Sequence, residues 1–488
     1  MSSGDRQHAV TNAVPAELFI NGRWQPSSGA KTFDVEDPST GEVLRAVADA
    51  TPQDGMAALD AAVAAQARWA RYPPRERGEI LRRAYEMMMR RQDDLALLMT
   101  LEMGKPLTES RGEIAYAAEF FRWFAEEAVR VDGSFATAPN GAGRVLTMRQ
   151  PVGPSLLITP WNFPAAMGTR KIGPAVAAGC TMVLKPASLT PLSMLAIADL
   201  LAECGLPDGV LNVVPSSRPG QLMEPLIRDG RARKLSFTGS TEVGRLLLEQ
   251  CAEQIMRTSM ELGGNAPFLV FADADLDAAL QGAMVAKMRN IGEACTAANR
   301  FYVHADLVEE FSHRLAERMS SLRIGRGSDE GVQVGPLIDA KARDKVQHLV
   351  DDAVARGAQV LVGGEPVDGP GYFYRPTVLV NVPSDAELTS TEIFGPVAPI
   401  TSFTDEQQVL AAANDSPFGL VSYVYTRDLN RALRVCEGLE AGMVGLNQGL
   451  VSNPAAPFGG IKHSGLGREG GAGGIEEFLE TKYVAVAT

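Results

Sequence analysis

The sequence predicts an α/β protein built around parallel sheet, and three observations along the chain support this fold class. Residues 53–131 read as consecutive helices. From residue 151, short apolar runs alternate with helix-like segments, which is the βαβ rhythm of a parallel sheet with nucleotide-binding potential. A second region of the same alternating kind begins near residue 265. The 48 glycines favour the many tight turns that such a fold needs.

The expected helices and strands follow from the spacing of apolar residues and from the prolines that interrupt it. Alanines at 57, 61 and 64 give an approximate helical face, the prolines at 73 and 74 interrupt it, and 80–103 resumes it. The next expected elements are strands over 155–159, 181–184, 210–214 and 234–237, with a helix over 191–203. In the second region we expect strands over 267–271 and 301–303 and helices over 276–288 and 311–322.

Two strand-like segments, 143–149 and 480–486, stand apart from both regions. Exposed strands of this kind commonly pair with another subunit. The N-terminal residues before the first helix read as loose chain, and no sequence repeat is visible.

Length and composition limit the classes of function that the chain can have. A chain of 488 residues is long enough for two or three domains. Its net charge of −13 argues against nucleic acid or an anionic membrane as a partner. The uncharged stretch 150–169 contains four prolines, which makes it a poor membrane-spanning helix.

The cysteines and histidines point to a reducing compartment and to no metal site. The five cysteines are widely spaced without a CxxC pair, and the histidines show no metal-ligand spacing. Residues 1–14 are polar and mixed in charge, so no signal peptide is visible. We therefore expect a soluble cytoplasmic enzyme without metal.

A thiol and a carboxylate in glycine-punctuated loops carry the strongest chemical signal. Cys295 lies in the run 288–300, and Glu261 opens the run Glu-Leu-Gly-Gly-Asn about thirty residues earlier. Such a pair can perform covalent chemistry on a carbonyl, provided that the thiol is activated. The alternative for any one cysteine is a buried small hydrophobe. We assign that role to the other four, which are Cys180, Cys204, Cys251 and Cys436.

A turn at 238–244 follows an expected strand and opens a helix. Val243, Leu247, Cys251 and Ile255 recur every four residues and predict one buried face for that helix. Its N-terminus would offer free amides to a pyrophosphate, although the glycine pattern is not the common GxGxxG. A simple capped turn is an equal alternative.

Two more loops present polar groups at strand ends. Lys185 and the residues after it suit a ribose hydroxyl or phosphate, with a solvated turn lysine as the alternative. In 160–164 two prolines fix a loop that presents the indole of Trp161 and the carboxamide of Asn162. That carboxamide can donate to an oxyanion, and a purely structural loop is the alternative.

Together these runs resemble the aldehyde dehydrogenase superfamily over nearly the whole chain, from 19–22 to 465–469. The matching motifs, in family order, are PWNFP at 160, KPAS at 185, FTGST at 237, ELGG at 261, the Cys295 run, and EIFGP at 392. The resemblance implies a Rossmann-type cofactor domain, an α/β catalytic domain and a small β oligomerisation flap in a homodimer or homotetramer. The implied boundaries are 1–128 and 150–262 for the cofactor domain, 263–463 for the catalytic domain, and 129–149 and 464–488 for the bridging segments.

The resemblance also implies residue roles. Cys295 is the nucleophile, Asn162 and the Cys295 amide hold the oxyanion, and Glu261 is the base for deacylation. The implied cofactor-binding residues are Trp161, Asn162, Lys185, Pro186, Ala187, Ser188, Gly239, Ser240, Leu262, Glu392 and Phe394.

Three further positions resemble the succinate-semialdehyde dehydrogenases. Arg170 lies eight residues after Asn162, Arg289 lies six before Cys295, and Ser452 lies in Gly-Leu-Val-Ser. In that subfamily these positions hold the far-end carboxylate of the substrate, which suits the fork of an arginine. The alternative is that the two arginines form internal ion pairs.

We therefore expect NAD(P)-dependent oxidation of succinate semialdehyde to succinate. The rivals are glutarate semialdehyde or another short ω-carboxy aldehyde, a thiol esterase without redox chemistry, and a catalytically silent binding protein. Ser188 stands where strongly NAD-preferring relatives often carry glutamate, so NADP is preferred and NAD is possible.

Two departures from the family pattern matter. Glu293 replaces the usual glutamine two residues before the nucleophile. A carboxylate facing the thiol would raise the thiol pKa, and one pointing away would not. Ala297 stands where some succinate-semialdehyde enzymes have a second cysteine, so no disulfide switch is expected.

Overall fold

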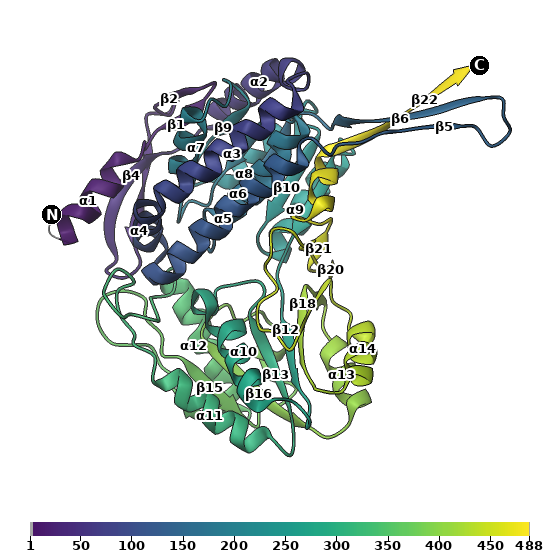
Figure 1. Ribbon diagram of the computed structural model, residues 1–488. Helices are drawn as coiled ribbons and strands as arrows, with labels where there is room; N and C mark the ends of the chain where they lie inside the picture. Colours follow the sequence, from purple (N-terminus) through teal and green to yellow (C-terminus); the bar gives the residue numbers. More distant parts are fainter. Residues whose placement is uncertain (1–2, 488) are drawn as a thin grey trace.

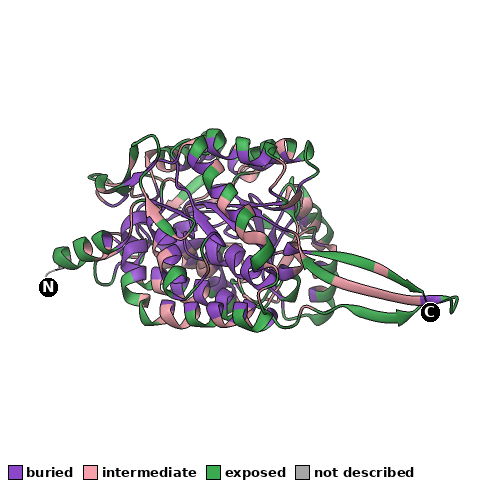
Figure 2. Cartoon of the chain, turned by 90° about the horizontal axis from the view of Figure 1, so that it is seen from above, coloured by how far each residue is buried: buried purple, intermediate pink, exposed green. Residues whose placement is uncertain are grey.

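The computed structural model describes residues 3–487, which form two α/β lobes and a projecting arm (Figure 1). Each lobe has its own largely parallel sheet with helices packed on both faces. The predicted α/β fold class is confirmed. Figure 2 shows that the buried residues fill the interior of the body, whereas the arm is mostly exposed or half-buried.

The upper lobe in Figure 1 contains an eight-stranded sheet whose five central strands are parallel. Across the sheet the strands are β2 (Arg23–Gln25), β1 (Leu18–Ile20), β9 (Leu211–Val213), β8 (Met182–Lys185), β7 (Ser155–Ile158), β10 (Lys234–Thr238), β11 (Arg257–Glu261) and β21 (Gly465–Leu466). The chain runs outward from β7 to β9 and then returns to the other side of β7 with β10. Such a reversal leaves a crevice outside the carboxyl ends of the two strands, where α/β proteins bind ligands.

Helices cover both faces of this sheet. On one face lie α2 (Pro52–Trp69), α8 (Pro219–Arg228) and α9 (Thr241–Ala252). On the other face lie α6 (Ala166–Ala178) and α7 (Leu192–Glu203), overlaid by α3 (Pro74–Arg90), α4 (Gln92–Met103) and α5 (Leu107–Glu127), with α1 (Ser3–Ala13) beside α4.

The predicted helical region is confirmed with its break. Thr51 accepts a bond from the Asp54 amide and starts α2, and Pro74 opens α3 after the break. Gly104, with φ of +94°, ends α4 in the left-handed conformation that glycine tolerates. The N-terminus differs from the expectation, because α1 forms there.

The prediction of one buried face for α9 is partly wrong. Leu247 and Cys251 are buried, but Val243 is 45% exposed and Ile255 is 92% exposed. A four-residue step overshoots one helical turn by about 40°, so the series drifts off a single face. The helix also ends at Ala252, before Ile255.

The lower lobe contains a seven-stranded sheet, parallel except at β14. Its strands, in order, are β14 (Gln359–Val362), β15 (Thr377–Val380), β16 (Val397–Phe403), β13 (Ala298–His304), β12 (Ala266–Val270), β18 (Val421–Tyr425) and β19 (Met443–Leu446). One face carries α10 (Leu276–Met288), α11 (Val308–Ser320) and α12 (Ala340–Ala355), and the other carries α13 (Glu406–Asn414) and α14 (Leu429–Gly438).

The remaining strands form three small sheets. The arm consists of β5 (Ser134–Thr137), β6 (Gly143–Pro151) and β22 (Leu479–Ala487), and β22 pairs with the whole length of β6. The two segments predicted as detached strands are thus strands that pair with each other. The sequence reading omitted the hairpin of β3 (Thr32–Asp37) and β4 (Glu42–Ala48) and the pair β17 (Phe418–Gly419) and β20 (Ile461–Lys462). Short 3-10 turns are η1 (Arg289–Gly292), η2 (Glu387–Thr389) and η3 (Ala472–Phe478).

Within residues 3–487, no helix has the length and apolar character needed to cross a membrane. The same residues contain no group of three or more side chains placed to hold a metal ion.

Candidate active site

A cavity of about 280 Å³ lies where the two lobes meet. The chain enters it directly after β7 and β10, the strands that flank the reversal in the upper sheet. From the other side it is closed by segments that lead into β12, β13 and β16 of the lower sheet. The carboxyl edge of one sheet therefore faces the amino edge of the other across the cavity.

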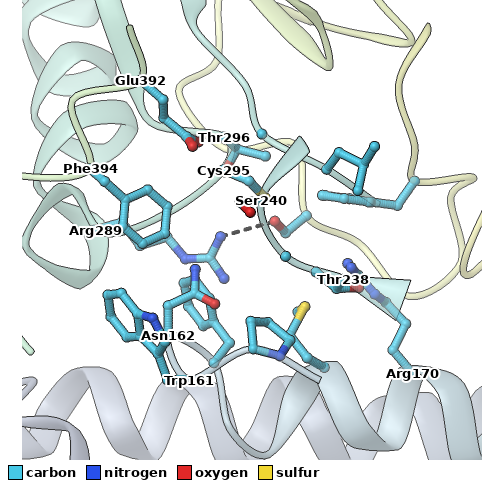
Figure 3. Close-up of a pocket in the computed structure, with 18 of the residues that line it drawn as sticks. Trp161, Asn162, Arg170, Thr238, Ser240, Arg289, Cys295, Thr296, Glu392 and Phe394 are labelled. Atoms are coloured by element: carbon cyan, nitrogen blue, oxygen red, sulfur yellow. Dashed lines mark hydrogen bonds between the residues drawn. The ribbon is translucent and has the colours of Figure 1, made fainter. Parts of the chain in front are cut away.

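Most of the predicted site residues line this cavity, and Figure 3 shows labelled side chains of both lobes converging on it. The predicted residues in the lining are Trp161, Asn162, Arg170, Gly239, Ser240, Leu262, Arg289, Cys295, Glu392, Phe394 and Ser452. Glu261 is buried at the end of β11 and does not line the cavity. The residues Lys185, Pro186, Ala187 and Ser188 also lie outside the lining, at the end of β8 beside β7.

Cys295 lies between η1 and β13 and is half-buried. Desolvation raises the pKa of its thiol to about 12, and the nearby Arg170 opposes this rise. Cys180, Cys204 and Cys251 are buried, as expected. Cys436 is only half-buried, because it lies on the amphipathic helix α14, whose buried side is formed by other residues.

Asn162 is held from both its backbone and its side chain. Its backbone carbonyl accepts bonds from Lys105 Nζ at 2.7 Å and from Asn290 Nδ2 at 3.0 Å. Its own Nδ2 donates to the Glu293 carbonyl at 2.9 Å. Lys105 in turn meets Glu113 Oε2 at 2.5 Å. The loop that presents the carboxamide is therefore fixed by two donors, Lys105 and Asn290, and by one acceptor, the Glu293 carbonyl.

The segment between Arg289 and Cys295 has strained backbone. Asn290 and Ile291 have φ of 54° and 61°, and a β-branched residue rarely adopts this conformation. The Asn290 amide donates to Glu109 Oε2 at 2.5 Å, and the Asn290 side chain bonds the Glu293 carbonyl at 2.8 Å. These contacts hold the turn that sets the nucleophile relative to Arg289.

Arg289 lines the cavity without a direct ion pair among the described residues, and Glu109 is a carboxylate within electrostatic range of it. Its Nη1 donates to Ser452 Oγ at 2.9 Å, and its guanidinium lies over the rings of Phe163 at 4.7 Å and Tyr116 at 5.8 Å. No carboxylate of the described residues forms an ion pair with it. The geometry suits an incoming anion.

Arg170 differs, because it forms the internal ion pair that the sequence left as an alternative. Its Nε lies 2.5 Å from Glu469 Oε2, and Glu469 Oε1 lies 2.5 Å from Lys171 Nζ. The Arg170 guanidinium also lies 4.2 Å from the centre of the Phe458 ring. Two cations thus share one carboxylate. Together the three side chains keep one net positive charge beside the cavity wall.

Glu261 and Glu469 are buried carboxyl groups whose pKa values move in opposite directions. Neither carboxylate oxygen of Glu261 has a hydrogen-bond partner in the described part of the chain, and desolvation together with the charge of Glu469 raises the pKa of Glu261. Arg170 and Lys171 lower the pKa of Glu469. The raised pKa makes the Glu261 carboxylate the stronger base of the two, whereas Glu469 remains ionised between its two cations.

The other end of the cavity fits a nicotinamide cofactor. Trp161 and Phe394 meet edge to face with ring centres 5.3 Å apart. Glu392 Oε1 accepts from the Gly264 amide at 3.1 Å, and burial raises the pKa of Glu392 to about 7. The buried hydroxyl of Thr238 has no partner among the described residues, so it is available to a ligand.

The residues at the end of β8 fit the adenosine side of such a cofactor. Ser188 is half-buried and carries no charge that would repel a 2′-phosphate. Burial lowers the pKa of Lys185 to about 8, so an anion beside it would stabilise its charged form. Ser240 caps α9 by accepting from the Val243 amide at 3.3 Å, at a helix N-terminus that favours phosphate.

Glu293 is fully buried, two residues before Cys295. Its Oε1 accepts from the Ile338 amide at 3.1 Å, and its Oε2 has no hydrogen-bond partner among residues 3–487. Burial raises the pKa of this carboxyl well above its usual value. A protonated glutamic acid has nearly the shape of glutamine, which explains how the chain accommodates this departure.

Several residues that build the site were not among those predicted from the sequence. They are Lys105, Glu109, Glu113, Tyr116, Phe163, Asn290, Thr296, Phe458 and Glu469. A signal existed for three of them, because Glu109, Glu113 and Tyr116 recur at helical spacing on one face of α5.

Comparison with known proteins agrees with this geometry. Residues 24–484 match the profile of the aldehyde dehydrogenase family. The chain is 59% identical to a succinate-semialdehyde dehydrogenase of Paenarthrobacter nicotinovorans, over 91% of this chain and 99% of that protein. It is 51% identical to a glutarate-semialdehyde dehydrogenase of Pseudomonas putida, over 96% of this chain and 98% of that protein. The crystal structure of an NADP-dependent enzyme of E. coli superposes with a TM-score of 0.97 at 51% identity, covering 98% of this chain and 99% of that one.

Proposed function

The chain belongs to the aldehyde dehydrogenase family, and from this premise we propose that its substrate is succinate semialdehyde, which it oxidises to succinate. The observation that carries the choice of substrate is Arg289. It forms no ion pair within the described residues, its guanidinium donates to Ser452, and it lines the same cavity as Cys295. An aldehyde with a carboxylate at its far end satisfies both groups at once.

The residues of the site support a covalent reaction sequence. The Cys295 thiolate attacks the aldehyde carbon, and the carboxamide of Asn162 with the Cys295 amide holds the oxyanion. The resulting thiohemiacetal loses the aldehyde hydrogen with its electron pair and becomes a thioester on Cys295. A bound nicotinamide supplies the acceptor for that hydride.

Hydrolysis of the thioester needs a base, and we assign Glu261. Its carboxyl group is buried beside the cavity and bonds none of the described residues, so a turn of the side chain towards Cys295 breaks no hydrogen bond with them. Glu469, held by Arg170 and Lys171, stays ionised behind it. The base takes a proton from water, and the water oxygen displaces the Cys295 sulfur to release succinate.

We propose NADP as the preferred cofactor and NAD as a usable one. Ser188 removes the repulsion that a carboxylate would exert on the 2′-phosphate, and the similar E. coli structure is that of an NADP-dependent enzyme. The cofactor-binding segments would be 1–128 and 150–262, and the catalytic segment 263–463.

We further propose a homodimer or homotetramer in which 129–149 and 464–488 bridge subunits. The exposed arm supports this assignment. The free cysteines of the described chain fit a reducing cytoplasm.

The rival substrate is glutarate semialdehyde. A similar relative carries that name. One methylene in a pocket discriminates by only about 1–3 kcal/mol, so both substrates are expected to react. The thiol esterase rival uses the same Cys295 without a redox step.

The deciding experiment measures NAD(P)H formation at 340 nm. Semialdehydes with far-end carboxylates and chains of about two to six carbons, and uncharged aldehydes of equal length, are assayed with NADP and with NAD. We expect the highest kcat/KM with succinate semialdehyde and NADP, and no activity in Cys295→Ala. Equal kcat/KM for charged and uncharged aldehydes would overturn the substrate proposal. Ester cleavage without aldehyde-dependent NAD(P)H would favour the esterase.

A further inference from the structure

We infer that Tyr116 is a specificity-determining residue whose phenol hydroxyl binds the far-end carboxylate of the substrate together with Arg289 and Ser452. The inference rests on the proposed function, because it concerns the same carboxylate. Tyr116 lines the cavity but belongs to none of the sequence motifs of the site.

Tyr116 is presented by a helix that is anchored on two sides of the cavity. Glu109, Glu113 and Tyr116 recur at positions i, i+4 and i+7 and so share one face of α5. Glu109 accepts from the Asn290 amide at 2.5 Å, next to Arg289 in the chain. Glu113 Oε1 accepts from the amides that open α6, at 3.0 and 3.2 Å.

These two anchors tie α5 to the segment of the nucleophile and to the segment of the oxyanion donor. The third residue of the face is therefore held at the cavity rather than free to swing away. The ring of Tyr116 also packs edge to face against Phe120, with ring centres 4.9 Å apart. A fixed aromatic side chain presents its hydroxyl with little loss of conformational freedom.

The surroundings of Tyr116 are cationic. The Arg289 guanidinium lies 5.8 Å from the centre of its ring, and Arg170 is within electrostatic range of its hydroxyl. Within residues 3–487, no hydrogen bond joins that hydroxyl to another residue, although Arg289 and Ser452 beside it bond each other. Tyr116 thus brings an available donor to the lining of the cavity that Arg289 also lines, where the substrate carboxylate must lie.

The chemistry of a carboxylate explains what this donor adds. A carboxylate has about four lone-pair sites, which one arginine fork and one serine hydroxyl do not saturate. A phenol donates one more hydrogen bond without adding a charge that would also attract water or other anions. An uncharged aldehyde has no group at that position and gains nothing from the phenol.

The test is Tyr116→Phe, which removes one oxygen and keeps the ring packing. For succinate semialdehyde we expect KM to rise about tenfold or more with kcat nearly retained, because a hydrogen bond to a charged group is lost. For butanal the change should be much smaller. The matched control is Tyr85→Phe, since Tyr85 also lies beside an arginine, Arg122, but outside the cavity.

Each other outcome has a defined meaning. Unchanged kinetics with both aldehydes would overturn the inference and leave Tyr116 as a packing residue. Equal losses with both would assign it a structural role and overturn the inference as well. If the wild-type enzyme does not prefer succinate semialdehyde to butanal, the proposed function fails independently of Tyr116. Binding of succinate to the cofactor-free enzyme, measured by calorimetry, gives a readout without turnover and should weaken about tenfold in Tyr116→Phe but not in Tyr85→Phe.

Discussion

Arg170 and Arg289 both line the cavity and differ in whether a carboxylate contacts them directly. Arg170 and the neighbouring Lys171 share the carboxylate of Glu469, whereas Arg289 contacts the hydroxyl of Ser452 and aromatic faces, with Glu109 in electrostatic range. An arginine without a direct carboxylate contact keeps donors of its fork free, so the cavity can take up a carboxylate there. We therefore propose that the choice of substrate depends most on Arg289.

Arg289→Ala should lower kcat/KM for succinate semialdehyde, because the transition state loses a charge-assisted contact. The expected loss of transition-state stabilisation is about 1.5–3 kcal/mol. Butanal should be affected much less. Steady-state kinetics with both aldehydes measures the difference. The matched control is Arg75→Ala, which removes an exposed arginine of α3 and should change neither value. Equal losses for the two aldehydes would contradict a role in carboxylate binding.

The raised pKa of Cys295 predicts how its reactivity depends on pH. Because desolvation raises the pKa to about 12, the thiolate fraction of the cofactor-free enzyme should rise about tenfold per pH unit between pH 7 and 10. Alkylation by iodoacetamide, followed for the Cys295 peptide by mass spectrometry, should follow this slope. The half-exposed Cys436 provides an internal comparison in the same sample. A plateau near neutral pH would show that the thiol is activated without cofactor, contrary to this expectation.

Among the elements, the turn from Arg289 to Cys295 is the one whose form depends most on distant partners. Its left-handed residues are stabilised by Glu109, which lies 181 positions earlier in the chain, and by contacts with the Asn162 loop. Gly292 is required there, since a Cβ would lie 2.2 Å from the Gly395 carbonyl oxygen. Local spacing reveals the glycine but not the partners.

This contrast shows how far the sequence could predict the elements. The helix over 276–288 and the strands around 155 and 234 were predictable, because burial imposes their apolar patterns. The face of α9 was mispredicted, since four-residue spacing alone does not show where a helix ends. The motif residues of the cavity were identified by resemblance, whereas Tyr116 and Lys105 are placed by packing of helices that carry no motif.

Glu293→Gln tests whether the buried carboxyl of the nucleophile turn is protonated. A carboxyl whose pKa is raised on folding contributes its full stability below the unfolded pKa and loses it as pH rises towards the folded pKa. Glutamine keeps the shape without titrating. The variant should therefore match the wild type near pH 4 and gain stability relative to it as pH increases to 8.

Thermal unfolding at several pH values measures this difference. Glu249→Gln, at an exposed position of α9, is the matched control and should show no comparable pH-dependent gain. A variant that is less stable than the wild type at pH 8 would indicate that Glu293 is ionised and paired in the folded protein.

At the scale of the whole molecule, the site exists only because two sheets meet edge to edge. The upper sheet contributes the ends of β7 and β10, and the lower sheet contributes the approaches to β13 and β16. The βαβ alternation predicted both sheets. It could not give their relative orientation, which depends on contacts across the lobes such as the bond from Asn290 to Asn162.

The arm is the part of the molecule that does not bury its own apolar surface. Phe135, Leu146 and Val484 are opposite one another in register, so they form one row on the same face of the three strands. Phe135 is 68% exposed, and Val486 on the same face is 40% exposed. Exposed apolar surface of this kind commonly marks a site of contact with another protein. Covering by a second copy of the chain would remove this surface from solvent.

The double variant Phe135→Ser with Val486→Ser should therefore weaken assembly. Burying each apolar side chain contributes about 1.5–3 kcal/mol to the free energy of association. Loss of both side chains should therefore raise the dissociation constant of the oligomer at least about a hundredfold. Sedimentation velocity across a concentration series measures this shift. Val354→Ser, which changes a 43% exposed valine on α12, is the matched control and should leave assembly unchanged. If the double variant keeps the wild-type size at every concentration, the arm does not bridge subunits, and its apolar row must serve another purpose.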